Sequence, residues 1–242
     1  MPSFDIIIKG GTVIDGSGAP ARDADVGIVG ERVVEIGKLS GSATRTIDAS
    51  GRLVTPGFVD IHSHLDAQVA WDAACSSSCW HGVTSVVVGN CGVTFAPVKP
   101  TDHELLAKLM ESVEDIPADS IMRGLDWNWQ SYGEYYDALD VMPKGINLGG
   151  MVGHCAVRFY GMGERSIDSD AHPSADELEV MVKTVDEAIA AGALGFSSSR
   201  VLGHRVPDGR PVPGTFALRE ELFALADPMR KRGRGVFEVV PR

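Results

Sequence analysis

Two histidines and one cysteine in the amino-terminal half of the chain are of the residue types that bind transition metals. His62 and His64 lie two residues apart at the end of an apolar segment, and Cys91 lies between Asn90 and Gly92 at the end of another. Side chains two residues apart on a strand point to the same face, so both imidazoles are expected on one side. Imidazole and thiolate are ligands that zinc prefers. The spacing therefore predicts a metal site of His62, His64 and Cys91.

Each of these residues also has a simpler interpretation. The histidines could be core residues satisfied by hydrogen bonds, and a buried cysteine is often an inert packing residue. The glycines that flank Asn90 and Cys91 let the backbone turn tightly, which favours the ligand role. Asp66 follows His64 by two residues and either orients an imidazole or caps the next helix, and the sequence leaves both open.

The elements that must position these residues follow a repeated strand, loop and helix pattern from Pro56 onward. Strands are predicted near residues 58–62, 84–89, 147–152, 193–198 and 235–240, and helices near 102–114, 174–191 and 217–232. Parallel strands joined by helices form a doubly wound sheet or an eight-stranded barrel, and both place their chemistry at the carboxyl ends of the strands. No Gly-x-Gly-x-x-Gly turn follows the first strand, which favours the barrel and argues against dinucleotide binding.

The helix near 174–191 has the clearest boundaries in the sequence. Ser174 and Glu177 have the spacing of a capping box, and Gly192 is placed to end the helix. Pro228 is expected to bend the helix near 217–232.

Residues 1–55 have a different pattern from residues 56–242, so we assign two domains. Short apolar and polar alternation between Gly- and Asp-rich turns predicts a small antiparallel sheet in the first. The second is expected to be α/β, with an incomplete TIM-like β/α barrel of about five of the eight strands. The chain is therefore expected to be a fragment, and a half-barrel that dimerises to close is the alternative.

Composition excludes several classes of function. The chain has 242 residues, 44% of them hydrophobic, and a net charge of −11, so no basic surface for nucleic acid is expected. No apolar stretch reaches the ~20 residues that span a membrane, and no secretory signal is recognisable, so a cytoplasmic protein is expected. The four cysteines do not suggest a disulfide framework.

Two motifs resemble one enzyme family. The segment Pro56-Gly57-Phe58-Val59-Asp60-Ile61-His62-Ser63-His64-Leu65-Asp66, together with Gly89-Asn90-Cys91-Gly92, is similar to the N-acyl-D-amino-acid deacylase (D-aminoacylase) branch of the amidohydrolase superfamily. The resemblance implies a β/α barrel beside a small β-sandwich segment, and hydrolysis of the linear amide of an N-acyl D-amino acid with one or two zinc ions. It also implies that Cys91 takes the place that hydantoinases and dihydroorotases give to a carboxylated lysine on the fourth strand, where this chain has none.

The resemblance implies further residues that this chain lacks or replaces. The family's general-base aspartate ends the eighth strand and is expected beyond residue 242, so no catalytic residue is assigned and little turnover is expected from the chain alone. The fifth strand offers Glu238 where the family has a histidine ligand, either as a substitute ligand or as a buried pair partner. The alternatives for function are a cyclic-amide hydrolase and a catalytically silent barrel used for binding or assembly.

The loop after the fourth strand is the predicted substrate site. The family has Ser-Thr-Gly-Leu there, whereas this chain has Ser198-Ser199-Arg200 followed by His204 and Arg205. Arg200 and Arg205 are predicted to bind a substrate carboxylate, with solvated loop cations as the alternative, and His204 is either a pocket residue or a surface residue. The expected partner is a small N-acyl amino acid or a related amide.

Overall fold

The computed structural model describes residues 3–241, which divide into two compact units, Met1–Gly57 and Phe58–Arg242. Each unit is described by itself. Our assignment of residues 1–55 and 56–242 as domains stays a prediction. Within the described residues, no helix is both long enough and apolar enough to span a membrane.

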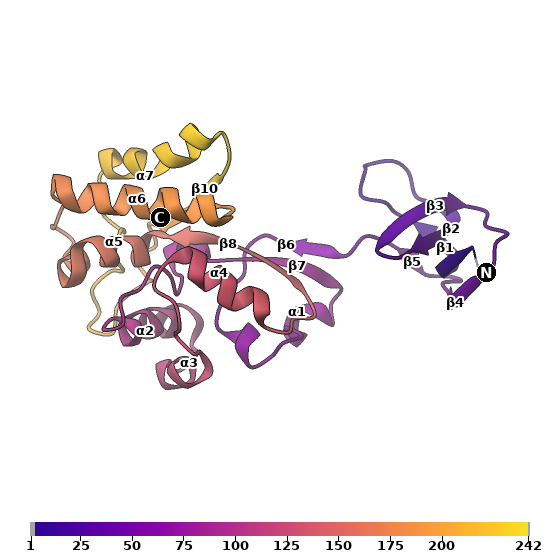
Figure 1. Cartoon of the computed structure of the whole chain (residues 1–242), viewed down its shortest axis with the longest axis horizontal. Helices are drawn as coiled ribbons and strands as arrows, with labels where there is room; N and C mark the ends of the chain where they lie inside the picture. Colours follow the sequence, from indigo (N-terminus) through magenta and orange to yellow (C-terminus); the bar gives the residue numbers. More distant parts are fainter. Residues whose placement is uncertain (1–2, 242) are drawn as a thin grey trace. The chain divides into compact units, whose positions relative to one another are not determined.

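The smaller unit is one mixed sheet built around its first strand (Figure 1). Its strands are β1 (Phe4–Val13), β2 (Arg22–Val29), β3 (Arg32–Gly37), β4 (Ala43–Asp48) and β5 (Leu53–Val54). β1 pairs antiparallel with β2 on one edge, and parallel with both β4 and β5 on the other. The predicted antiparallel sheet is therefore wrong for β4 and β5. After β3 the chain crosses to the far edge of β1, so both strands run in the direction of β1.

A bend in β1 explains why two short strands share one of its edges. The register of β1 shifts between Ile8 and Gly11, and Gly10 has a φ of +72°, which favours glycine. β4 pairs before the bend, and β5 pairs after it. The buried core is small and centres on Phe4, Ile7 and Leu39. Residues 3–57 form a single sheet, so the predicted sandwich is not confirmed.

The larger unit is built on a parallel sheet whose strands follow one another in sequence order (Figure 1). In the described residues these strands are β6 (Phe58–Asp60), β7 (Val83–Val88), β8 (Asn147–Gly153), β9 (Gly195–Ser199) and β10 (Val236–Val240). A doubly wound sheet reverses its strand order at a switch point, whereas a barrel adds each strand beside the last. The order β6-β7-β8-β9-β10 has no reversal. The sheet is a curled parallel half-barrel, as expected for part of a TIM-like fold.

Helices cover the sheet between successive strands. They are α1 (Ser76–Cys79), α2 (His103–Glu114), α3 (Ala118–Gly124), α4 (Tyr132–Val141), α5 (His154–Met162), α6 (Ala175–Ala191) and α7 (Arg219–Arg232), with 3-10 turns η1 (Gln68–Ala70), η2 (Asn90–Gly92) and η3 (Gly163–Ile167). The predicted capping box of Ser174 and Glu177 is present, and Gly192 ends α6 at a φ of +119°. α1, α3, α4 and α5 were not predicted from the sequence, although α4 begins with a capping box of Ser131 and Glu134.

The core of the larger unit lies between the sheet and these helices. α6 packs against α4, α5 and α7, and contributes the fully buried Met181, Val185 and Ile189. Phe196 of β9 is fully buried and belongs to the same apolar core. Each large apolar side chain buried in this way contributes ~1.5–3 kcal/mol. This packing fixes the carboxyl ends of β7, β8 and β9, where the polar residues of interest lie.

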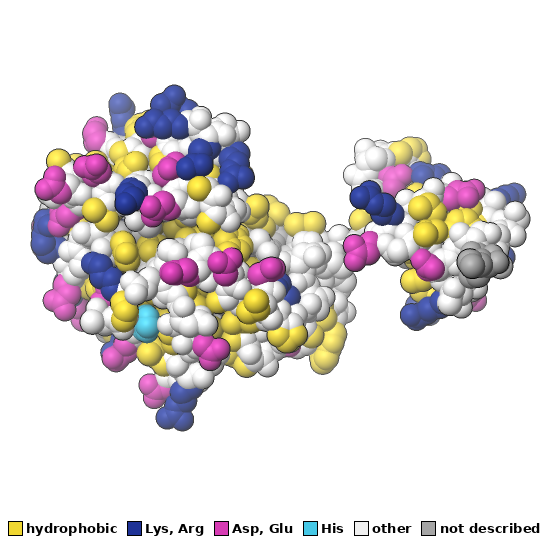
Figure 2. Space-filling view, viewed as in Figure 1, with side chains coloured by type: hydrophobic (Ala, Val, Ile, Leu, Met, Phe, Trp, Pro, Cys, Tyr) yellow, Lys and Arg dark blue, Asp and Glu magenta, His cyan; other side chains and the backbone are white. Residues whose placement is uncertain are grey.

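Charged side chains are dispersed over the surface. On the face that Figure 2 shows, Lys and Arg are interspersed with Asp and Glu on both units. The two edge strands of the larger sheet expose large apolar side chains, including Val59 at 62% and Val236 at 61%. Edge strands with exposed apolar side chains are sites of association with other protein surfaces.

Candidate metal centre

His62 and His64 follow the short strand β6 and lie side by side. The Asp60 carboxylate accepts the backbone N–H of His62, and the Ser63 N–H donates to the Val87 carbonyl, which extends the pairing with β7 beyond Asp60. The two imidazole centroids are 5.5 Å apart in an edge-to-face arrangement. The side-by-side imidazoles expected from the spacing are therefore present in the structure.

Cys91 reaches the same place through a tight turn after β7. Gly89 has a φ of +73°, and a Cβ there would lie 2.1 Å from the Met151 carbonyl oxygen, so only glycine fits. Cys91 itself has a φ of +57° and is 6% exposed. A non-glycine residue in this left-handed region costs on the order of 1–3 kcal/mol and is concentrated at functional sites. The strained turn therefore lowers the local stability of the chain, and it directs the Cys91 thiol toward the two imidazoles.

A hydrogen bond ties this turn to the histidine segment. The Asn90 side-chain amide donates to the Ser63 carbonyl at 3.2 Å and to the Val87 carbonyl at 2.9 Å. Asn90 is fully buried, and Ser63 lies between the two histidines. The amide thus fixes the cysteine turn and the histidine pair as one assembly.

The ligand atoms of His62, His64 and Cys91 all lie within 4.8 Å of one another. His62 Nε2 is 3.2 Å from Cys91 Sγ, and His64 Nδ1 is buried without a hydrogen-bond partner among residues 3–241. Tetrahedral zinc, with Zn–N of about 2.0 Å and Zn–S of about 2.3 Å, places nitrogen and sulfur ligands about 3.5 Å apart. The cluster therefore has the donor types and the spacing that fit zinc. A bound zinc ion would give His64 Nδ1 a partner.

Without a bound ion, the protonation of His64 suits a cation, whereas that of Cys91 does not. Burial, with the nearby His62 and His204 rings, lowers the pKa of His64 to about 4, so its imidazole is neutral and keeps a lone pair. Burial and the carboxylates of Glu238 and Glu114 raise the pKa of Cys91 to about 12. A thiol that coordinates a metal is deprotonated. A bound divalent cation would therefore lower the pKa of Cys91 and hold it as a thiolate.

Two carboxylates flank the cluster, one at each imidazole. Glu238 Oε1 lies 3.9 Å from His62 Nδ1, and Glu114 Oε1 lies 3.7 Å from His64 Nε2. Glu238 Oε2 also accepts the backbone N–H of Cys91 at 3.3 Å.

Asp66 does not cap the helical turn that follows it. The N-cap of η1 is Ala67, and no side chain caps this turn. Burial raises the pKa of Asp66 to about 8, against the backbone N–H groups of Asp66 and Gly89, which lower it. The capping alternative for Asp66 is therefore wrong, and a role in orienting an imidazole stays a prediction.

Three consecutive serines of β9 each hold a different part of the site. Ser197 accepts the Gly92 N–H at 3.0 Å and donates to the Gly89 carbonyl, so it closes the Cys91 turn from the opposite side. Ser198 lies 2.9 Å from His154 Nδ1, and Ser199 lies 3.0 Å from His204 Nδ1. All three serines are buried.

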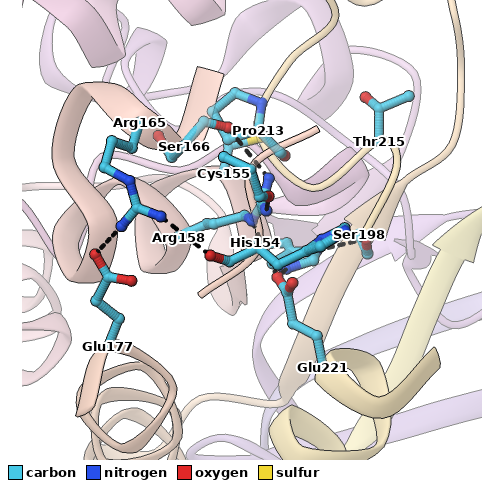
Figure 3. Close-up of polar contacts among 12 residues, drawn as sticks. His154, Cys155, Arg158, Arg165, Ser166, Glu177, Ser198, Pro213, Thr215 and Glu221 are labelled. Carbon is cyan, nitrogen blue, oxygen red and sulfur yellow. Dashed lines mark hydrogen bonds and ion pairs between the residues drawn. The ribbon is translucent and has the colours of Figure 1, made fainter. Parts of the chain in front are cut away.

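The segment after β8 contains a buried charged network (Figure 3). His154 is fully buried, with Nδ1 facing Ser198 and Nε2 2.9 Å from Glu221 Oε1. The Arg158 Nε lies 3.1 Å from the same carboxylate oxygen, and its side chain is 3% exposed. Burial lowers the pKa of His154, so the neutral ring donates from Nε2 to Glu221 and accepts at Nδ1 from Ser198. The network joins α5, β9 and α7.

The same network holds the loop after β9 in place. A Cβ at Gly214 would lie 2.5 Å from His154 Nδ1, so the loop passes directly over the ring. The Cys155 thiol donates to the Pro213 carbonyl at 3.3 Å, and Arg200 donates to the Thr215 carbonyl at 2.8 Å.

The predicted substrate residues lie on this loop and differ in their surroundings. His204 is hydrogen-bonded to Ser199 and lies close enough to His64 to lower its pKa. Arg200 is half-buried against Thr215, and the exposed Arg205 donates to the Gly209 carbonyl at 2.6 Å. The structure brings His204 toward the metal cluster, whereas the two arginines hold loop carbonyls.

Several residues that shape the site were not predicted. Ser197, Asn90 and Glu114 contact segments far away in the sequence, and Gly92 and Ser197, for example, are 105 positions apart. The position of Ser197 at the end of a predicted strand was the only indication of its role. Glu114 ends a helix, which gave no indication of its proximity to His64.

Comparison with known proteins places this geometry in a family. The sequence profile of the amidohydrolase family matches residues 45–240. The chain belongs to the amidohydrolase family. It is 38% identical over 231 residues to an N-acyl-D-glutamate deacylase of Alcaligenes xylosoxydans xylosoxydans, an alignment that covers 95% of the chain and 42% of that relative.

Two solved structures resemble the chain in fold and sequence. A Bordetella bronchiseptica N-acyl-D-glutamate deacylase, complexed with zinc and a phosphonate inhibitor, matches with a TM-score of 0.78 and 34% identity over 98% of the chain and 44% of that structure. A D-aminoacylase described by its binuclear metal centre matches with a TM-score of 0.76 and 34% identity, covering 97% and 44%. This amidohydrolase chain thus spans about two fifths of the length of these relatives.

Proposed function

We propose that the protein carrying this chain is a zinc-dependent hydrolase of linear amides that removes the acyl group from an N-acyl D-amino acid. The observation that carries the proposal is the cluster of His62, His64 and Cys91, whose ligand atoms lie within 4.8 Å at the carboxyl ends of adjacent parallel strands. Similarity to deacylases of N-acyl D-amino acids over most of the chain supports the substrate class.

In this proposal, the chain's own residues hold and orient the reacting groups. His62, His64 and Cys91 would bind one zinc ion, and a second ion is an open part of the proposal. Zinc is a Lewis acid that polarises a scissile carbonyl and activates water for attack. Asn90 and Ser197 hold the thiol and the imidazoles in fixed relative positions, because they form hydrogen bonds to the segments on both sides of Cys91.

The loop after β9 is the proposed substrate-binding segment. An N-acyl amino acid presents a carboxylate, for which an Arg guanidinium or a His ring is a suitable partner. His204 lies on this loop and its ring contributes to lowering the pKa of His64, and we propose that it contacts the substrate. Arg200 and Arg205 as carboxylate-binding residues, and a general-base aspartate beyond residue 242, stay predictions.

The cyclic-amide alternative is less well supported. The resemblance assigns a carboxylated lysine on the fourth barrel strand to cyclic-amide hydrolases, and β9 has the sequence Gly195-Phe196-Ser197-Ser198-Ser199 without a lysine. A silent binding barrel would not need the strained Cys91 turn, whose cost is accounted for by a ligand role.

The test is an assay of the protein carrying this chain, with zinc, on paired N-acetyl D- and L-amino acids and on hydantoin. We expect release of the free D-amino acid, detected with a D-amino-acid oxidase, and its loss after chelation of zinc. Hydrolysis of hydantoin in preference to the linear amides would favour the cyclic alternative. Hydrolysis of none of these substrates by zinc-loaded protein would contradict the proposal.

A further inference from the structure

We propose that Glu238 is a positioning residue for the metal centre, and that its carboxylate orients His62 and Cys91 toward the ion together. The inference rests on the proposed function, because it assumes that these two residues bind a metal. In this proposal Glu238 holds two metal ligands that follow different strands, His62 after β6 and Cys91 after β7. The alternative is that Glu238 only neutralises a neighbouring charge.

The position of Glu238 in the sheet aims its side chain at the cluster. Glu238 is the middle residue of β10 and pairs with Ser197 of β9, the serine that closes the Cys91 turn. From there, Oε2 accepts the Cys91 backbone N–H at 3.3 Å, and Oε1 lies 3.9 Å from His62 Nδ1. One carboxylate therefore faces two of the three proposed ligands, each by a different oxygen.

The two nitrogens of His62 are thereby divided between two tasks. Nε2 lies 3.2 Å from Cys91 Sγ, on the side where a shared ion would bind, and Nδ1 faces Glu238. A metal-binding histidine usually donates its other ring N–H to a carboxylate or carbonyl, which fixes the tautomer and the ring orientation. Glu238 Oε1 faces Nδ1 at 3.9 Å, beyond hydrogen-bond distance, and would receive this N–H after a small movement on metal binding, which leaves the Nε2 lone pair directed at the site.

The surroundings argue against an ordinary ion pair. Within residues 3–241, Glu238 has an ion-pair contact with His62 and none with Lys or Arg. Its side chain is 21% exposed, so it is largely removed from water. A carboxylate that is mostly buried beside an imidazole, a thiol and a backbone N–H is stabilised by a cation that the imidazole and the thiol bind.

The experiment compares the purified chain with Glu238→Gln and, as a matched control, Glu179→Gln on the exposed face of α6. Zinc affinity is measured by competition with a chromophoric chelator, and the absorption spectrum is recorded with Co²⁺ in place of zinc. We expect Glu238→Gln to weaken zinc binding ~10–100-fold, the effect of losing a carboxylate behind a metal-binding histidine. The cobalt–thiolate band and the d–d bands should keep their positions and intensities, and Glu179→Gln should match the parent.

The other outcomes distinguish failure of the positioning role of Glu238 from failure of the proposed function. Unchanged zinc affinity in Glu238→Gln, with zinc bound by the parent, would overturn the positioning role and leave the proposed function standing. Altered d–d bands would overturn it in favour of direct ligation by Glu238. A parent chain that binds no zinc would overturn both proposals. If circular dichroism shows that Glu238→Gln is unfolded, Glu238→Asp replaces it, with the same expected loss of affinity because the shorter side chain cannot span both ligands.

Discussion

Nε2 of His154 lies 2.9 Å from Oε1 of Glu221, and both side chains are almost completely inaccessible to solvent. The pair joins the start of α5 to the first turn of α7. Arg158 lies 3.1 Å from the same oxygen, so a buried cation also depends on this carboxylate. The loop that carries His204 packs directly on the His154 ring at Gly214.

The first prediction concerns the charge of Glu221. Glu221→Gln keeps the shape of the side chain but leaves Arg158 as an uncompensated buried cation, which costs on the order of 3–5 kcal/mol. Urea denaturation should show this loss, whereas the exposed Glu179→Gln should stay within about 0.5 kcal/mol of the parent. Equal stability of the two variants would mean that the network does not stabilise the fold.

The second prediction concerns pH. Burial lowers the pKa of His154 more than the hydrogen bond from its ring to Glu221 raises it, so the folded state binds fewer protons than the unfolded state below about pH 6.5. Burial alone would raise the pKa of Glu221, but the hydrogen bond from His154 and the charge of Arg158 lower it overall. Both shifts have the same sign, so the contribution of this pair to the free energy of unfolding should fall as pH decreases from 7 to 5. The buried Asp66, whose pKa of about 8 lies above its ordinary value, contributes with the opposite sign, so the contribution of the pair is measured by difference.

A His154→Gln variant tests this assignment. The variant removes the His154 contribution, so the stability of the parent relative to the variant should fall as pH decreases from 7 to 5. Some dependence should remain, because burial also lowers the pKa of His64, His103 and His204. Urea denaturation of zinc-free protein at several pH values measures both slopes, and identical slopes would exclude His154 as a source.

The third prediction concerns Ser197. Ser197→Ala removes the hydroxyl that accepts from Gly92 and donates to Gly89, and leaves those buried backbone groups unpaired. We expect a loss of about 1–3 kcal/mol and weaker zinc binding, because the turn that aims Cys91 is released. The exposed Ser120→Ala of α3 is the control. Loss of stability with unchanged zinc affinity would show that the turn does not need the serine.

The fourth prediction concerns the edges of the half-barrel. Val59 and Val236 are 62% and 61% exposed on the two edge strands, and edges of this kind promote association. Light scattering coupled to gel filtration should show concentration-dependent assembly of the parent chain, reduced by Val59→Lys with Val236→Lys. Val141→Lys, at an 84% exposed position on α4, should leave assembly unchanged. A parent that stays monomeric at high concentration would contradict this prediction.

The sequence predicted features that depend on local pattern. The capping box at Ser174, the parallel strands and the approach of His62 and His64 to Cys91 all follow from short-range spacing and from the rule that strand ends share one edge. The parallel pairing of β4 and β5 with β1 could not be predicted, because the alternation of apolar and polar residues does not say which edge of the sheet a returning strand joins.

The parts of the site that were not predicted depend on contacts between distant segments. Glu238 reaches Cys91 across 147 residues, and His154 reaches Glu221 across 67. The sequence offered Glu238 only as a departure from a family pattern, with two roles left open. Its place between His62 and Cys91 becomes visible only when β10 is laid beside β9.

Zinc content per chain, measured by elemental analysis on the purified chain and on Cys91→Ala and His62→Ala/His64→Ala variants, tests the central claim most directly. Circular dichroism of each variant serves as the control for folding. We expect near-stoichiometric zinc in the parent and its loss in both variants, because the three side chains supply the ligands that lie within 4.8 Å. Zinc retained by folded variants, or absent from the folded parent, would contradict the metal centre.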